Sequence, residues 1–195
     1  MTIGIRTLGG AELAAALDAL ADLRIEVFAE WPYLYDGDAA YEREYLGEFA
    51  GEEGLVLVAA MDGDRIVGAA TASPMSGRKP DFRRPFEALG HDTSRLFYFG
   101  ESVLLPAYRG KGIGHAFFDR REAAARAYGA THATFCAVVR REDYTRSPPG
   151  HRPLDPFWRA RGYEKVEGLT TSFDWKETGS AGEIAHTMQF WMAAL

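Results

Sequence analysis

The sequence contains a single cysteine, Cys136, among its 195 residues. One cysteine excludes an intrachain disulfide and a cysteine-based metal cluster. The five histidines are scattered without metal-ligand spacing, so we expect no metal site. Cys136 lies within an apolar run, and free cysteines are among the most often buried residues. We therefore expect a buried structural thiol in preference to a nucleophile.

Long hydrophobic runs are also absent. No uninterrupted apolar stretch approaches the roughly 20 residues that a membrane-spanning helix requires. Residues 1–6 show a strand-like pattern and no signal-peptide architecture, so we expect a cytoplasmic protein with no membrane partner. Basic residues are outnumbered, 22 against 28 acidic ones, and the resulting net charge of −6 argues against a nucleic-acid partner.

Internal repeats, linkers and low-complexity segments are missing as well. A chain of 195 residues, 47% of them hydrophobic and 26% charged, has the composition of a globular protein and is long enough to bury a core. We expect one domain of α/β class (α+β mixed) that spans residues 1–195.

Hydrophobic periodicity and turn residues predict the element order β-α-α-β-β-β-α-β-α-β-β. The expected strands are 2–8, 55–60, 65–72, 96–105, 131–139, 169–175 and 185–192. The expected helices are 13–28, one that begins near residue 38, 112–128 and 153–161. Residues 73–95 interrupt the pattern with prolines, glycines and basic residues, and only a helical turn or two is expected there, over 84–89. The inner face of helix 112–128 is expected to carry Ile113, Phe117, Ala124 and Ala127.

The stretch from 103 to 128 combines the end of an apolar strand, a glycine-rich turn and a helix. Gly110, Gly112 and Gly114 occupy alternate positions, and Arg109 and Lys111 add positive charge beside them. Glycines let the backbone approach a ligand closely, and the amides at a helix start have no intrahelical partner. Such a helix start attracts anions. The sequence therefore predicts a site for a phosphate or pyrophosphate.

Two common nucleotide-binding patterns do not fit this turn. The dinucleotide-binding pattern is G-x-G-x-x-G, whereas the glycines here follow G-x-G-x-G. The Walker A pattern requires Gly where Leu105 stands and Ser or Thr where Gly112 stands. An ATP-binding loop is thus disfavoured, and a glycine-rich turn that binds nothing is the remaining alternative.

The run Arg109-Gly110-Lys111-Gly112-Ile113-Gly114 resembles the R/Q-x-x-G-x-G/A motif of the GCN5-related N-acetyltransferases (GNAT), and Pro106 and Tyr108 match the lead-in of that motif. The order of elements is similar to that of the family. The resemblance implies the GNAT fold, a central mixed β-sheet flanked by helices. It also implies acetyl-CoA as co-substrate, bound by Val103, Leu104, Leu105, Arg109, Gly110, Lys111, Gly112, Ile113 and Gly114.

The same resemblance implies how the donor is held. The glycine loop would grip the pyrophosphate, and backbone groups of residues 102–105 would pair with the pantetheine arm like an added strand. An N–H near Leu104 would polarise the acetyl carbonyl, and the parallel strand at 135–138 would splay away to admit the cofactor. The implied reaction is acetyl transfer to an amine.

Two residues are candidates for catalysis. Glu101 is the first choice for the general base, because a carboxylate inside an apolar strand is costly unless it is paired or used. An ion pair with an arginine of residues 73–95 is the alternative. Family members with a strand glutamate have it nearer to the position of Tyr98, and strand alternation places 98 and 101 on opposite faces unless a bulge intervenes.

The proton donor for the departing thiolate is open. Trp158 stands where members of the family often have a tyrosine, and an indole cannot donate a proton as a phenol does. Tyr98, Tyr144 and water are the alternatives, and a reaction without an acid is another.

The acceptor is expected to be a small amine. Residues 31–48 interleave aromatic and acidic side chains, which indicates either a solvated acidic helix with aromatics at the core edge or an acceptor pocket for a cationic amine. A non-catalytic CoA-binding module of the same fold is the alternative function. Dimers are common in the family, so a homodimer is a further expectation.

Overall fold

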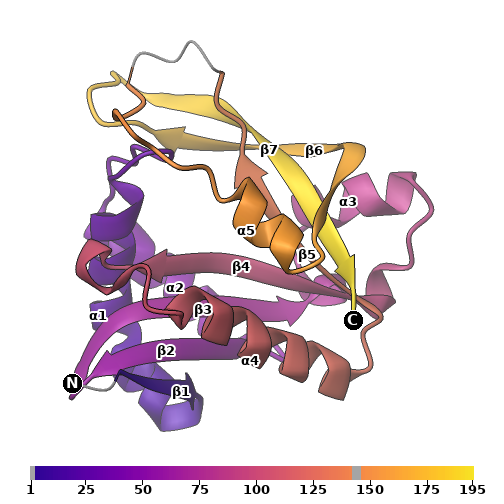
Figure 1. Ribbon diagram of the computed structural model, residues 1–195, viewed down its shortest axis with the longest axis horizontal. Helices are drawn as coiled ribbons and strands as arrows, with labels where there is room; N and C mark the ends of the chain where they lie inside the picture. The colour runs from indigo at the N-terminus through magenta and orange to yellow at the C-terminus, as the bar shows by residue number, and fades with distance from the viewer. Residues whose placement is uncertain (1–2, 142–145) are drawn as a thin grey trace.

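The computed structural model describes residues 3–141 and 146–195, which form a mixed β-sheet with helices on both faces (Figure 1). The elements in chain order are β1 (Gly4–Leu8), α1 (Gly10–Phe28), α2 (Ala39–Ala50), β2 (Val56–Asp62), β3 (Arg65–Pro74), α3 (Pro80–Ala88), β4 (Leu96–Leu104), α4 (Ile113–Tyr128), β5 (His132–Val138), α5 (Asp155–Ala160), β6 (Glu164–Lys176) and β7 (Glu183–Ala194). Short 3₁₀ helices occupy Met75–Gly77, Thr93–Arg95 and Pro106–Tyr108.

Across the described residues, seven strands make one sheet in the order β1-β2-β3-β4-β5-β7-β6. The β4–β5 pair is parallel and the other neighbours are antiparallel. The predicted mixed α/β fold and its element order are confirmed, with the addition of α3 between β3 and β4.

Helix α3 is longer than the sequence indicates. Only a turn or two is predicted over 84–89, whereas the helix starts at Pro80 and ends at Ala88. The helix is rich in charged residues and contains Pro85, which has no backbone N–H to donate. Both features argue against a helix in the sequence pattern. Phe86 is fully buried against the ring of Phe190 at a centroid distance of 4.8 Å, so tertiary packing stabilises this segment.

Figure 1 shows α4 and α5 on the near side of the sheet and α1 and α2 on the far side. The predicted inner face of α4 is partly wrong. Ile113 and Phe117 are buried as predicted, but Ala127 is exposed, Ala124 is half-buried, and Arg121 and Ala125 are buried in their place. A charged residue on the core face breaks the hydrophobic pattern from which the face was predicted. None of the helices described is long and apolar enough to cross a membrane.

Candidate functional site

The parallel strands β4 and β5 stay together over a short distance only. They pair from Leu96 opposite His132 to Tyr98 opposite Thr134. Beyond these positions β4 continues along β3 to Leu104, and β5 continues along β7 to Val138. The strands therefore diverge toward their C-terminal ends (Figure 1), and we call this opening the β4–β5 split. The predicted divergence of residues 135–138 is confirmed.

Backbone groups of β4 face the split at alternate residues. The Leu105 N–H donates to the Val67 carbonyl at 3.0 Å, which fixes the phase of the β3–β4 ladder. Hydrogen-bonded and non-hydrogen-bonded pairs alternate in an antiparallel ladder, so Val103 and Leu105 turn their backbone groups toward β3. Ser102 and Leu104 turn theirs toward the split. Of the residues expected to hold the pantetheine arm, Leu104 therefore presents its backbone N–H to the split.

The glycine loop joins the open end of the split to α4. Gly110 and Gly112 have φ angles of 73° and 81°, a region in which side chains with a Cβ are strained. The Cβ positions of both residues point into open space, and both glycines are exposed. Gly112 is the residue before the first turn of α4, so the first amides of that helix, which have no partner within the helix, begin beside these two exposed glycines.

The two cations of the loop are anchored to the body of the protein. Arg109 donates from Nε to the Leu104 carbonyl at 3.0 Å, and its Nη2 lies 2.8 Å from a carboxylate oxygen of Glu30. The Lys111 ammonium lies 5.3 Å from the ring centroid of Tyr108. These contacts hold both charges beside the first turn of α4.

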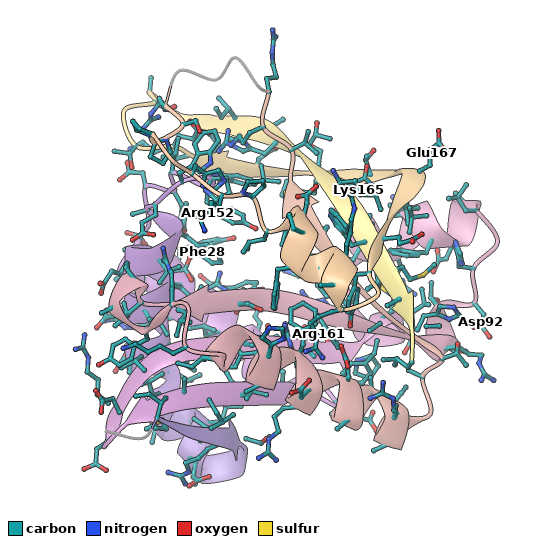
Figure 2. All side chains as sticks on the ribbon, in the orientation of Figure 1. Phe28, Asp92, Arg152, Arg161, Lys165 and Glu167 are labelled. Carbon is teal, nitrogen blue, oxygen red and sulfur yellow. The ribbon has the colours of Figure 1, made fainter. Side chains whose placement is uncertain are left out.

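Helix α5 covers the start of α4 on the other side of the split. Arg161, which directly follows α5, lies between the two helices in Figure 2 and pairs with Asp119 at 2.7 Å and Glu122 at 3.1 Å. The Phe157 ring packs against the loop, where a Cβ added to Gly114 would lie 3.5 Å from its Cζ. The loop and the β5 side of the split are thus held together.

A β-bulge decides which face Glu101 occupies. Ala70 of β3 is opposite Ser102 of β4, whereas Ala72 is opposite Phe99, so β4 uses one more residue than β3 over this interval. Gly100 lies in the bulge, and a Cβ there would approach Thr71 Oγ1 to 2.3 Å. The extra residue reverses the alternation of side chains. Glu101 therefore lies on the same face as Tyr98, the face that carries α1 and α2.

Glu101 forms a buried ion pair. Its Oε1 lies 2.6 Å from Nη1 of Arg24 in α1, and Nε of Arg24 donates to Glu42 of α2 at 2.5 Å. Burial is the largest influence on Glu101 and opposes its ionisation, but the Arg24 guanidinium, a backbone hydrogen bond and the charge of Arg78 together hold the pKa of the carboxyl below its ordinary value. The ion pair predicted as one alternative exists, but its arginine comes from α1 and not from residues 73–95.

Tyr98 and Cys136 face each other where the split begins. The Tyr98 hydroxyl lies 3.2 Å from Cys136 Sγ, and burial together with this neighbour raises the pKa of Tyr98. Cys136 is partly buried, and burial raises the pKa of its thiol to about 12, which agrees with the expected poor nucleophile. Trp158 packs against Trp191 at a ring-centroid distance of 5.1 Å, away from Tyr98. Tyr144 lies outside the described residues.

The segment between α1 and α2 is fastened to the β6–β7 hairpin. The Tyr33 carbonyl accepts hydrogen bonds from Trp175 Nε1 at 3.0 Å and from Arg140 Nη2 at 3.1 Å. Arg140 also donates to the Pro32 carbonyl at 2.7 Å and pairs with Glu177 at 2.6 Å. The Tyr33 side chain is close enough to Cys136 and Glu101 for their charges to reinforce burial in raising its pKa. The hairpin thus positions this segment beside Glu101.

Several acidic residues of 31–48 have partners within the protein. Glu42 is 1% exposed and pairs with Arg24, which does not fit a solvated acidic helix. Asp38 caps α2 by accepting from the Tyr41 N–H at 2.8 Å. Asp36 pairs with Lys176 at 2.6 Å. In the acceptor-pocket alternative, the carboxylates that would attract a cationic amine are therefore engaged in part by the protein itself.

Sequence reasoning missed Arg24 and Arg140. Arg24 could have been noticed, because it lies between Leu20 and Phe28 on the apolar face of α1, where a charge is costly unless it is paired. Arg140 lies in a polar connection and shows no comparable signal, because its partners come from distant parts of the chain.

The comparisons with known proteins agree with this geometry. A family model described as the acetyltransferase (GNAT) family matches residues 17–147. No curated protein matches the chain.

Solved structures share the fold at low sequence identity. A ribosomal-protein-alanine N-acetyltransferase from Brucella melitensis matches with a TM-score of 0.59 and 19% identity over 98% of this chain and 99% of that one. A phosphinothricin acetyltransferase from Sinorhizobium meliloti, in complex with AcCoA, matches with a TM-score of 0.59 and 20% identity over 100% of this chain and 89% of that one. The PaiA N-acetyltransferase from Thermoplasma acidophilum, in complex with coenzyme A, matches with a TM-score of 0.57 and 14% identity over 100% of both chains. With a family model matching most of its length and a split sheet beside a glycine loop, the chain belongs to the GNAT family of acetyltransferases.

Proposed function

We propose that this protein is an acetyl-CoA-dependent N-acetyltransferase that acetylates the amine of a small acceptor. One observation carries the proposal: the β4–β5 split leads to an exposed glycine loop at the N-terminus of α4. An extended pantetheine arm fits a split toward which β4 turns backbone groups, and a pyrophosphate fits the amides of a helix start. Two structures of similar fold are complexes with AcCoA or coenzyme A.

The donor occupies the residues expected from the sequence. The pyrophosphate lies on the amides of residues 110–114, with the side chains of Arg109 and Lys111 beside it. The pantetheine arm follows Val103, Leu104 and Leu105, and the N–H of Leu104 points to the acetyl carbonyl. In this arrangement the oxyanion that develops during attack is stabilised by a donor that is already in place.

The acceptor amine reacts from the face that carries Glu101 and Tyr98. The amine nitrogen attacks the thioester carbon, its proton passes to Glu101, and the C–S bond breaks to release the thiolate of coenzyme A. Tyr98 is the candidate for returning a proton to the thiolate, since its hydroxyl lies at the start of the split. Holding the amine and the thioester together contributes most of the rate enhancement.

The test is release of the coenzyme A thiol from acetyl-CoA with a broad panel of amines. We expect turnover with at least one amine, and we expect Gly114→Glu to remove it. A carboxylate at this position repels the pyrophosphate, so affinity for coenzyme A should fall about 100-fold or more, which corresponds to roughly 3 kcal/mol. Calorimetry measures the affinity.

Gly114→Ala is the matched control. Its Cβ would make an ordinary contact of 3.5 Å with Phe157, and the family motif accepts alanine here, so this variant should keep its affinity. Tight binding of acetyl-CoA without turnover of any amine would support the non-catalytic CoA-binding module instead. Competition by ATP at comparable affinity would point to a nucleotide site.

A further inference from the structure

Arg24 connects three elements at the acceptor face of the sheet. Its side chain is 11% exposed, and the carboxylates that it contacts, Glu42 and Glu101, are 1% and 10% exposed. The guanidinium also lies 4.6 Å from the ring centroid of Tyr45 and 5.1 Å from that of Phe28. The cation is therefore enclosed by two carboxylates and two aromatic rings.

We propose that Arg24 is a positioning residue for the acetyl transfer, and that it holds Glu101 ionised and in one orientation at the acceptor amine. This inference rests on the proposed function, because it concerns the same base. Arg24 does not touch the reacting atoms in this arrangement. It acts through Glu101.

The geometry of the guanidinium explains why an arginine fits this role. Its donors lie in one rigid plane, so Nε and Nη1 contact carboxylates on α2 and on β4 at the same time. An ammonium group is a point charge on a flexible stem and cannot fix both directions. Glu42 thus orients Arg24, and Arg24 in turn orients Glu101.

The pair with Arg24 leaves Glu101 able to accept a proton. An ionised carboxylate has about four lone-pair sites, and the contact with Arg24 uses Oε1. Without Arg24, Glu101 would lose its ion-pair partner, and burial favours the neutral acid. A protonated Glu101 cannot take the proton of the amine, so loss of Arg24 would raise the pH below which the base is lost.

The tyrosines and the thiol near Glu101 titrate at much higher pH than a carboxyl group. Burial raises the pKa of Tyr33 and Tyr98, raises that of Tyr45 to about 12 and that of Cys136 to about 12. The remaining charged groups around Glu101 are Glu42 on α2, Arg78 before α3, Arg121 on α4 across the sheet and Arg140 after β5. Glu101 and Glu42 are therefore the carboxylates to separate experimentally.

The experiment is the pH dependence of kcat/KM for wild type and for Arg24→Gln. The pKa of Glu101 is lowered in the folded protein, so wild-type activity is present at neutral pH and is lost as the pH falls through that lowered value. In Arg24→Gln the acid limb should move upward by about 1 to 3 pH units, with much of the rate recovered at alkaline pH. Arg24→Lys should give a smaller shift, because it keeps the charge and loses the planar contacts.

Arg43→Gln is the matched control. Arg43 also joins α2 to α1, through Asp18 at 2.6 Å, but this pair is exposed at the surface. Its removal should leave the acid limb of the pH profile in place. Glu42→Gln should not move that limb to higher pH, because Arg24 still pairs with Glu101. An unmoved limb in folded Arg24→Gln, with the rate lowered equally at every pH, would assign Arg24 a structural role and overturn the inference.

A second measurement does not depend on turnover. The carbon-13 shift of the Glu101 carboxyl, identified by its absence in Glu101→Gln, can be titrated in wild type and in Arg24→Gln or Arg24→Lys. We expect a higher apparent pKa in the variants, and an unchanged pKa would overturn the inference even if no amine is turned over. If wild type turns over no amine but the pKa of Glu101 is still higher in the Arg24 variants, the proposed function alone is overturned.

Discussion

Burial shifts the pKa values of ionisable side chains around the β4–β5 split. Arg121 is 1% exposed and lies 4.5 Å from the ring centroid of Phe99 and 4.8 Å from that of Phe118, and burial lowers its pKa to about 10. It donates to backbone carbonyls, among them that of Thr71 at 3.3 Å. Arg121 thereby fastens α4 to the strand that lies opposite the bulge, and it reaches Glu101 only across the sheet.

Cys136 should be a slow nucleophile in the folded protein. The thiolate is the reactive form, and burial raises the pKa of this thiol to about 12, which at pH 8 leaves on the order of 1,000-fold less thiolate than a free cysteine has. Reaction with a disulfide reagent at pH 8 should be slower by about 100-fold or more in the native protein than in urea. Since Cys136 is the single cysteine, the signal has one source. Equal rates in the two conditions would contradict the burial of the thiol.

At the scale of elements, the bulge in β4 depends on the absence of a side chain at one position. A Cβ on Gly100 would lie 2.3 Å from Thr71 Oγ1 but 3.6 Å from Thr71 Cβ, so the clash involves the hydroxyl alone. Thr71 Oγ1 is buried and has no hydrogen-bond partner among the described residues. The hydroxyl therefore contributes little to stability while it restricts what β4 can carry.

Gly100→Ala should destabilise the protein by about 1–3 kcal/mol, the usual cost of overpacking. Thr71→Ala should be nearly neutral, because it removes a buried polar atom that lacks a partner. The double variant should recover most of the loss, since the remaining contact is an ordinary one. Urea unfolding of the four proteins measures the coupling. Additive effects of the two substitutions would show that the hydroxyl is not the obstacle.

Local signals explain why much of this fold could be predicted from the sequence. The φ-positive Gly112 and Gly129 bracket α4, and Asp38 caps α2, so each boundary is marked by a neighbour in the chain. The bulge and the Arg24–Glu101 pair could not be predicted, because each depends on the register or the packing of elements that are distant in the sequence. The same holds for the hairpin contacts of Tyr33.

At the scale of the whole molecule, the sheet consists of two parts joined at the split. Strands β1–β4 and strands β5–β7 are connected within the sheet by the short parallel pairing at residues 96–98 and 132–134. Contacts of α4 and α5 bridge the two parts on one face, including the Arg161 pairs. A ligand lying in the split would contact both parts and reinforce this junction.

We expect coenzyme A to raise the thermal stability of the protein, and a single domain to unfold in one transition. At a ligand concentration about 100 times Kd, binding adds about 2.7 kcal/mol, which for a chain of this size shifts Tm by roughly 5–10 °C. Scanning calorimetry with and without coenzyme A measures the shift. Gly114→Glu should show none, and two separate transitions would contradict the single domain spanning 1–195.

The bulge at Gly100 also has an evolutionary consequence. The face on which Glu101 lies is set by the number of residues in β4 between Phe99 and Ser102, and the glycine at position 100 lets the extra residue fit. A point substitution can remove the carboxylate but cannot transfer it to the other face, whereas deletion of one residue would do so. Insertions and deletions in β4, and not substitutions of Glu101, therefore change the face on which this carboxylate lies. Relatives in which β4 differs in length by one residue would need a proton acceptor at another position.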